Sequence, residues 1–230
     1  MEHSVIDNLL RVRERIEKAA IKSGRSPDDI TLVAVSKMVR VEKIKKAISA
    51  GVTILGENYL QEAKTKIEEI GESVQWHMIG HLQTNKVKQA IALFDLIQSV
   101  DRLHLAQEIH KKAKKLDKVI RILVQVNISE EDSKSGIESK NAVSLISEIS
   151  KLENIRIEGL MTIPPYLLDP QRVRPYFRSL RKLSEEIVRR GVENTSIKEL
   201  SMGMSNDFDV AIEEGATIVR VGTAIFGERG

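Results

Sequence analysis

Lys37 is a residue that could bond covalently to a ligand. It follows an apolar run at residues 30–35, which is typical of a buried strand. Dehydration at such a position lowers the pKa of a lysine from about 10.4 towards neutrality, and a neutral amine can form an imine with an aldehyde. The common alternative is an exposed lysine at a strand end. Lys37 alone therefore does not distinguish a reactive amine from a surface charge.

Two glycine-containing turns near the end of the chain could hold an anion. Residues 200–207 read Leu-Ser-Met-Gly-Met-Ser-Asn-Asp, and residues 221–227 read Val-Gly-Thr-Ala-Ile-Phe-Gly. Each turn follows an apolar run and opens a helical stretch, so backbone N–H groups and hydroxyls gather where anions are favoured. Two such turns in succession point to a phosphate site more strongly than either does alone.

Arg220 interrupts the apolar run that precedes the second turn. It is in phase with Ile218 and Gly222, so its side chain takes a position where a valine would be expected. A guanidinium keeps its proton in proteins, and a buried one needs a partner. That partner is either a carboxylate of the protein or the ring nitrogen or phosphate of a ligand, and the sequence leaves both open.

Two histidines and an asparagine lie near other expected strand ends. His77 and His81 have the i, i+4 spacing of zinc ligands on a helix, but His77 falls in a run that predicts a strand, and the glutamate of the zinc motif is missing. We therefore predict no metal site. Asn58 follows the second apolar run, where it faces a ligand or caps the next helix.

These side chains must be positioned by alternating strands and helices. Lys/Glu-rich stretches with a 3.6-residue period predict helices, and eight short apolar runs between them predict strands. The runs cover residues 30–35, 52–55, 76–79, 96–99, 120–126, 155–160, 198–200 and 217–221. Such alternation means parallel pairing through right-handed crossovers.

We predict an α/β fold, a single closed (β/α)8 barrel of the TIM-barrel class, since eight units in about 200–250 residues match that architecture. The alternative, a doubly wound open sheet, requires a glycine-rich turn after the first strand. Residues 35–39 contain no glycine. An extra N-terminal helix is expected, because Val5, Leu9, Val12, Ile16 and Ala19 have helical spacing. In a barrel, chemistry takes place at the C-terminal ends of the strands.

The composition excludes several classes of function. The 230 residues carry 36 Lys and Arg against 33 Asp and Glu, a formal net charge of +3, so nucleic-acid binding by bulk charge is not indicated. Basic residues at 111–118 and 172–190 are expected to form solvated helix faces. The chain has no cysteine, no apolar run that could span a bilayer, and no signal-peptide core. We expect one domain over residues 1–230, located in the cytoplasm.

Taken together, these segments resemble the YggS/PROSC family of pyridoxal phosphate homeostasis proteins, whose fold is similar to the barrel domain of alanine racemase. The resemblance rests on Val-Ser-Lys at 35–37, Gly-Glu-Asn-Tyr at 56–59, residues 79–86, Gly-Leu-Met at 159–161, and segments 200–207 and 219–227, so it covers essentially the whole chain. The cofactor-binding residues that it implies are Lys37 for an imine with pyridoxal phosphate, Ser201, Gly222 and Thr223 for the phosphate, Arg220 for the pyridine nitrogen, and Asn58 and Met161 near the ring.

One residue departs from the family pattern. Asn206 stands where the Ser-Asp-Asp run of the family has an aspartate. We expect this position to cap the following helix, which asparagine does as well as aspartate.

The resemblance implies a binding module that buffers pyridoxal phosphate or delivers it to apo-enzymes, with no catalytic residues. An arginine does not give its proton to the pyridine nitrogen, so the ring is a poorer electron sink. The alternative is an amino-acid racemase with Lys37 as one base. The resemblance to alanine racemases implies that their second base is a tyrosine from an added β-domain. We expect no room for such a domain in this chain, and of its tyrosines only Tyr59 or Tyr166 could approach the barrel mouth. We expect a monomeric carrier.

Overall fold

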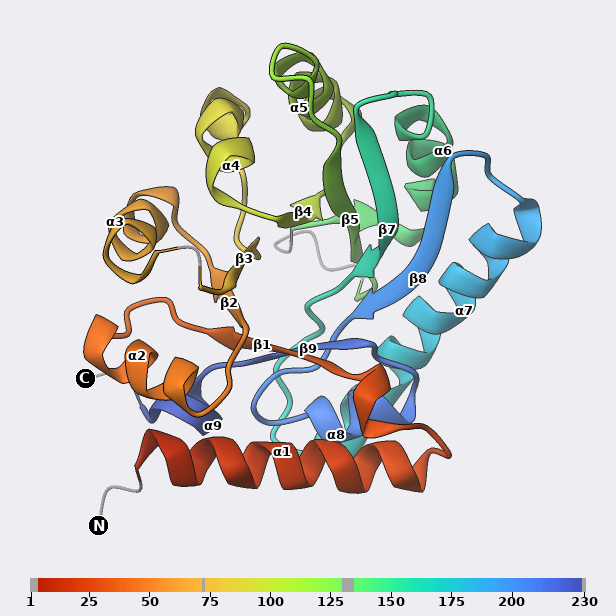
Figure 1. Ribbon diagram of the computed structural model, residues 1–230. Coiled ribbons are helices and arrows are strands. Elements are labelled where there is room, and N and C mark those ends of the chain that lie inside the picture. Colours follow the sequence, from red (N-terminus) through yellow and green to blue (C-terminus); the bar gives the residue numbers. More distant parts are fainter. Residues whose placement is uncertain (1–3, 72, 130–134, 229–230) are drawn as a thin grey trace.

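The computed structural model describes residues 4–71, 73–129 and 135–228, in which a ring of strands is surrounded by helices (Figure 1). The strands are β1 Thr31–Val35, β2 Ile54–Glu57, β3 Gln75–Met78, β4 Leu96–Val100, β5 Ile120–Asn127, β6 Ile137–Glu138, β7 Ile155–Met161, β8 Thr195–Ser201 and β9 Ile218–Val221. The helices are α1 Val5–Lys22, α2 Val41–Ser49, α3 Leu60–Ile70, α4 Val87–Leu93, α5 Leu103–Lys114, α6 Ser139–Ile149, α7 Arg174–Arg190, α8 Phe208–Glu213 and α9 Thr223–Phe226.

Parallel pairing closes the ring. The order runs β1, β2, β3, β4, β5, β7, β8, β9, and β9 pairs back onto β1. The predicted (β/α)8 barrel is therefore confirmed, and each of the eight predicted runs forms one of its strands. Two details differ from the prediction. The two-residue strand β6 pairs with the end of β5 and is too short to show a periodic pattern. Strand β8 begins at Thr195, three residues before the predicted run at 198–200. The sequence did not show this start, because the first residues of the strand are only half-buried and lack an apolar pattern.

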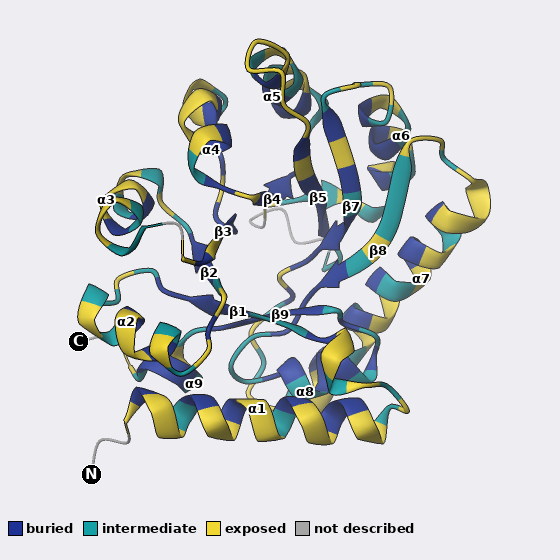
Figure 2. Cartoon of the chain, viewed as in Figure 1, coloured by how far each residue is buried: buried dark blue, intermediate teal, exposed yellow. Residues whose placement is uncertain are grey.

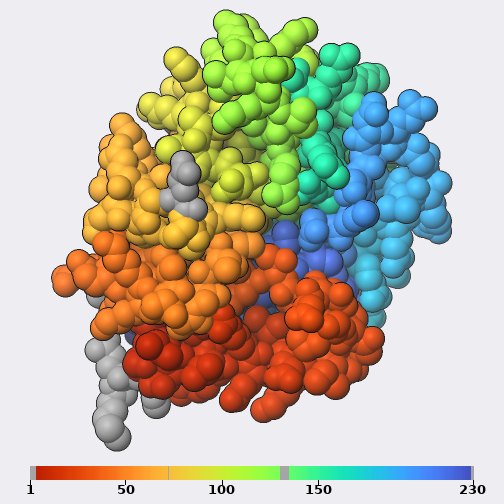
Figure 3. All heavy atoms as spheres, viewed as in Figure 1, coloured from red at the N-terminus to blue at the C-terminus, as the bar shows by residue number. Residues whose placement is uncertain are grey.

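The predicted N-terminal helix is α1, which packs outside the barrel against α8 and α9 (Figure 1). The five residues with helical spacing are all buried. Figure 2 shows the same pattern on the helices around the ring, which turn buried faces towards the strands and exposed faces outwards. In Figure 3, atoms from the beginning of the chain lie against atoms from its end on one face. Contact between the two parts of the chain thus helps to hold the barrel closed.

An apolar layer fills the inside of the barrel. Its side chains are Val33, Ile54, Leu96, Leu123, Met161 and Ile218, one from each of six strands. Gln98 and Arg220 follow Leu96 and Ile218 by two residues, so they point to the same side of β4 and β9, and both are buried. The interior thus changes from apolar to polar towards the C-terminal ends of the strands.

Part of the charged face of α7 is paired with acidic side chains of α8 and the residue after it. Arg174 on α7 donates hydrogen bonds to Glu213 and Glu214, and Arg178 donates to Glu214. Part of the second basic stretch therefore faces acidic side chains of the same protein. Within the described ranges, no helix is both long enough and apolar enough to cross a membrane.

Candidate functional site

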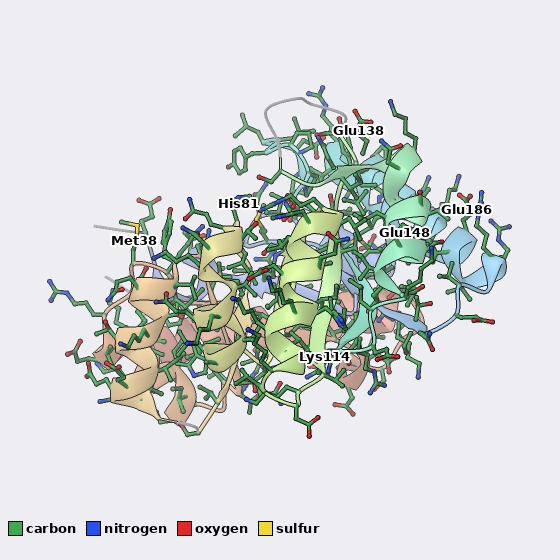
Figure 4. All side chains as sticks on the ribbon, turned by 90° about the horizontal axis from the view of Figure 1, so that it is seen from above. Met38, His81, Lys114, Glu138, Glu148 and Glu186 are labelled. Atoms are coloured by element: carbon green, nitrogen blue, oxygen red, sulfur yellow. The ribbon has the colours of Figure 1, made fainter. Side chains whose placement is uncertain are left out.

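A cavity of about 590 Å³ opens at the C-terminal ends of the strands. Figure 4 shows this end of the molecule, where Met38 after β1 and His81 after β3 lie, with Lys114 at the opposite end. The cavity is lined by Val35, Lys37, Asn58, Ile79, Ile163, Tyr166, Met204, Ser205, Asn206, Asp207, Arg220, Gly222, Thr223, Ala224 and Glu228. Five of the seven predicted site residues are therefore brought together: Lys37, Asn58, Arg220, Gly222 and Thr223.

Lys37 reaches the cavity because of the alternation of side chains along β1. Val33 belongs to the apolar interior layer, and Val35 and Lys37 both line the cavity. Lys37 is half-buried. Asn58, also half-buried, follows β2, the neighbour of β1 in the sheet. An amine and an amide thus share one wall of the cavity.

The turns after β8 and β9 meet at one hydroxyl. The backbone N–H groups of Gly222 and Ala224 donate to Ser205 Oγ, at 3.3 Å and 3.2 Å. Gly203 allows the first turn to fold this tightly, since its φ is +92° and a Cβ there would come within 2.6 Å of Ala211 Cβ. Asp207 Oδ1 secures the turn by accepting from the N–H of Met204 at 2.7 Å. Two amides that point at one oxygen form a cradle suited to an anion.

Ser205 is a site residue that the sequence analysis missed. The first turn contains two serines, and their spacing does not show which one faces the cavity. Ser205 lines the cavity, whereas Ser201 is fully buried inside the barrel. The presence of a second hydroxyl in the turn was the available signal.

Arg220 begins a row of hydrogen bonds across the barrel interior. Its Nη1 donates to Ser201 Oγ at 2.6 Å, and its Nη2 donates to the Thr162 carbonyl at 2.8 Å. Ser201 Oγ donates in turn to Gln98 Oε1 at 2.6 Å, and Gln98 Nε2 lies 3.0 Å from His77 Nδ1. Because guanidinium only donates, the serine proton must point to Gln98, whose amide then donates to His77.

The two titratable groups at the ends of this row, His77 and Arg220, have shifted pKa values. Burial, with a smaller effect from the charge of Arg121, lowers the pKa of His77 to about 3. A neutral imidazole with an accepting Nδ1 agrees with the direction of the hydrogen bonds. Burial also lowers the pKa of Arg220 to about 10, against the opposing charge of Asp207, so the guanidinium remains charged at neutral pH. Burial likewise raises the pKa of Asp207.

Met161 and Ser201 do not line the cavity. Met161 belongs to the apolar layer inside the barrel, and Ser201 lies between Arg220 and Gln98. Their contacts with a cofactor stay predictions. The expectation that Asn206 caps α8 was wrong, because Asp207 takes the N-cap position. Asn206 Nδ2 instead donates to the Leu167 carbonyl at 3.2 Å and so joins two loops of the cavity rim.

Tyr166, but not Tyr59, is among the residues that line the cavity. Tyr166 comes from the long loop after β7, and its side chain is largely exposed. The histidine pair does not form a ligand set, since His77 is buried in β3 beside Gln98 and His81 is exposed.

Similarity to known proteins covers the full length of the chain. The family model described as alanine racemase, N-terminal domain, matches residues 8–230. A pyridoxal phosphate homeostasis protein of Aquifex aeolicus is 47% identical over 224 residues, which is 97% of this chain and 97% of the relative. A protein of the same name from Escherichia coli K12 is 39% identical over 231 residues, covering 99% of this chain and 97% of the relative.

A solved structure with a bound cofactor has the same fold. PipY of Synechococcus elongatus, solved with PLP bound, is 31% identical and has a TM-score of 0.85, covering 97% of this chain and 100% of PipY. Family model, full-length relatives and solved structure agree with the resemblance seen in the strand-end motifs. The chain belongs to the family of pyridoxal phosphate homeostasis proteins, which share the barrel of the alanine racemase N-terminal domain.

Proposed function

We propose that this protein binds pyridoxal phosphate in the cavity at the barrel mouth, covalently at Lys37, and serves as a carrier that keeps the cofactor available in the cytoplasm. The observation that carries the proposal is that an amine, a cradle of two amides and a buried guanidinium line one cavity. These three groups match the aldehyde, the phosphate and the ring nitrogen of the cofactor. The names of the relatives and the PLP bound to PipY support the same ligand.

The residues of the cavity fit the two ends of this cofactor. When bound, pyridoxal phosphate supplies an aldehyde that condenses reversibly with a primary amine and releases one water. Lys37 is the lysine that lines the cavity among the described residues. At the other end, the N–H groups of Gly222 and Ala224 and the hydroxyls of Ser205 and Thr223 would hold the phosphate.

Arg220 would face the pyridine nitrogen. A guanidinium can donate a hydrogen bond to this nitrogen but does not transfer its proton. Its orientation is held by Ser201 and the Thr162 carbonyl, which accept from Nη1 and Nη2. An unprotonated ring withdraws electrons weakly, so the site favours storage over amino-acid chemistry. Asn58, on the same wall as Lys37, would lie beside the ring.

The same site would also allow the cofactor to be released. The bond to the Lys37 amine is reversible by water, and the cavity opens on the barrel mouth with the exposed Tyr166 at its rim. A carrier of this kind could transfer pyridoxal phosphate to apo-enzymes, and we propose that it acts as a monomer. The cysteine-free sequence fits a cytoplasmic location.

The first prediction tests the covalent bond at Lys37. We expect purified protein to take up pyridoxal phosphate with visible absorbance, and borohydride reduction to attach the cofactor permanently to the peptide that contains Lys37. Lys37→Ala should lose the absorbance and the adduct, while Lys43→Ala, in the next helix, keeps both. Mass spectrometry of the digested protein identifies the modified lysine. A wild-type protein that takes up no pyridoxal phosphate, or an adduct on another lysine, would contradict the proposal.

The same preparation distinguishes a carrier from a racemase. Tyr166 is the tyrosine that lines the cavity, and it would have to act as the second base. We expect no sustained racemisation of a panel of amino acids by the loaded protein. Turnover that is lost in both Lys37→Ala and Tyr166→Phe would show that the protein is a racemase.

A further inference from the structure

A buried ion cluster lies behind the loop that carries Lys37. Lys66 on α3 donates to Glu57 Oε1 at 2.8 Å and to Glu62 Oε1 at 2.6 Å. The side chains of Lys66 and Glu57 are 6% and 0% exposed, and that of Glu62 is 26% exposed. A buried ion pair usually contributes little net stability, because desolvation offsets the attraction. The cluster therefore calls for a role other than stabilising the fold.

The cluster holds the backbone on both sides of Lys37. Lys66 Nζ donates its third hydrogen bond to the carbonyl of Ser36, at 2.5 Å. Glu62 Oε1 accepts from the N–H of Met38, also at 2.5 Å. Ser36 Oγ adds a bond to Glu57 Oε1 at 2.7 Å. The residues before and after Lys37 are thus both bonded to charged groups of α3 and β2.

Met38 shows why the loop needs these bonds. Its φ is +59°, a left-handed conformation that costs a residue with a Cβ about 1 kcal/mol. The residue is 66% exposed, so packing does little to offset this cost. The bond from Met38 N–H to Glu62 is charge-assisted, and such bonds are the stronger ones. This bond holds the turn that sets the direction of the preceding residue, Lys37.

Lys66 itself is not available as a nucleophile. Its three N–H bonds each have an acceptor, in Ser36, Glu57 and Glu62. An ammonium in this state has no lone pair with which to attack an aldehyde. The two lysines therefore differ in role: Lys66 holds the loop, and Lys37 lines the cavity.

We propose that Glu62 and Lys66 are positioning residues that hold Lys37 in the orientation needed to bond to the aldehyde of the cofactor. The inference rests on the proposed function, since it concerns the amine assigned there. It predicts a selective effect. Loosening the loop should weaken binding of an aldehyde ligand, which needs a directed amine, and leave unchanged the binding of a ligand held only by its ring and phosphate.

The experiment compares pyridoxal phosphate with pyridoxine 5'-phosphate, which carries an alcohol in place of the aldehyde. Glu62→Ala removes the acceptor for Met38 N–H, whereas Glu62→Gln keeps an oxygen there. Glu68→Ala is the matched control, because Glu68 is an exposed residue of the same helix that pairs with Lys64. Lys66→Met is not used, since it would leave Glu57 buried without its cation. Dissociation constants are measured for both ligands, and thermal unfolding without ligand checks the fold.

We expect Glu62→Ala to bind pyridoxal phosphate about tenfold more weakly than wild type, and pyridoxine 5'-phosphate equally well. Glu62→Gln should recover most of the loss, and Glu68→Ala should match wild type. If Glu62→Ala weakened binding of both ligands equally, or of neither, the positioning role would be overturned. The proposed function would still stand in that case, provided that the wild-type protein binds pyridoxal phosphate. Failure of the wild-type protein to bind pyridoxal phosphate would instead overturn the proposed function, and this inference with it.

Discussion

Ser201, the last residue of β8, and Ser205, in the turn that follows, perform different tasks. Ser205 Oγ accepts from two backbone amides at the cavity wall. Ser201 Oγ lies inside the barrel, where it accepts from Arg220 and donates to Gln98. The Ser205 hydroxyl lines the cavity, and the Ser201 hydroxyl holds Arg220, for which we propose contact with the ring nitrogen of the cofactor.

Replacing each serine separately distinguishes these tasks. Ser205→Ala should weaken binding of pyridoxal phosphate about tenfold, since a hydrogen bond to a charged group is lost, and leave binding of pyridoxal, which lacks the phosphate, unchanged. Ser201→Ala should lower the free energy of unfolding by about 1–3 kcal/mol, because Arg220 and Gln98 each lose a buried partner. Binding titrations with both ligands and urea unfolding measure the two effects. A loss in Ser201→Ala confined to pyridoxal phosphate would assign the phosphate to Ser201 instead.

At the level of the strands, the pairing of β7 with β8 leaves no space for a Cβ at Gly159. Gly159 pairs with Glu199, and the register shifts between Ile157 and Gly159. A Cβ at Gly159 would lie 1.9 Å from the Glu199 carbonyl oxygen, so no other residue fits without moving a strand. After this shift in register, Met161 lies inside the barrel and Thr162 lies beside Arg220. Glycine is therefore needed at position 159, because a side chain there would clash with the backbone of β8.

Gly159→Ala should accordingly be among the more damaging small substitutions in the barrel. We expect the free energy of unfolding to fall by about 3 kcal/mol, since the clash is with backbone atoms that cannot rotate away. Gly24→Ala is the comparison, because Gly24 has a φ of +72° but open space around it, and it should cost about 1 kcal/mol. Chemical denaturation of the three proteins gives the values. Equal losses for the two variants would show that the strands separate easily at this point.

For the molecule as a whole, the polar barrel interior makes stability depend on pH. His77 is buried, and its pKa is lowered from 6.5 to about 3, mainly by burial. Between these values the unfolded chain binds a proton that the folded protein does not. The contribution of His77 to the free energy of unfolding is therefore complete above pH 6.5, and the protein loses this stability as the pH falls towards 3.

His77→Gln should flatten this dependence, because glutamine does not titrate and can still accept from Gln98. We expect the slope of unfolding free energy against pH, between 6.5 and 4, to decrease by up to about 1.4 kcal/mol per pH unit relative to wild type. The exposed His81→Gln should keep the wild-type slope. Urea unfolding at a series of pH values measures the slopes. If the His77→Gln slope equalled that of wild type, the folded protein would bind a proton at His77 over the same pH range as the unfolded chain, and the lowered pKa of His77 would be wrong.

Much of the fold was predictable because it depends on local periodicity. Each barrel strand corresponds to an apolar run, and the buried face of α1 is the stripe that begins at Val5. Strand β6 and the start of β8 were not predictable in this way, since two residues show no period and half-buried residues show no apolar pattern. Alternation placed Arg220 in phase with Ile218 and Gly222, and Arg220 and Gly222 both line the cavity. For Lys37 the sequence left open a reactive amine or a surface charge, and the structure places it in the cavity lining.

The sequence by itself determined the barrel, the order of its strands and the strand ends at which chemistry is possible, because alternation and helical spacing are properties of neighbouring residues. Only the tertiary structure decided which serine faces the cavity and that Asp207, not Asn206, stands at the N-cap position of α8. It also decided that Glu62 and Lys66 hold the backbone around Lys37. Such contacts join residues that are distant in the chain, and their geometry depends on how strands and helices pack, which no local pattern records.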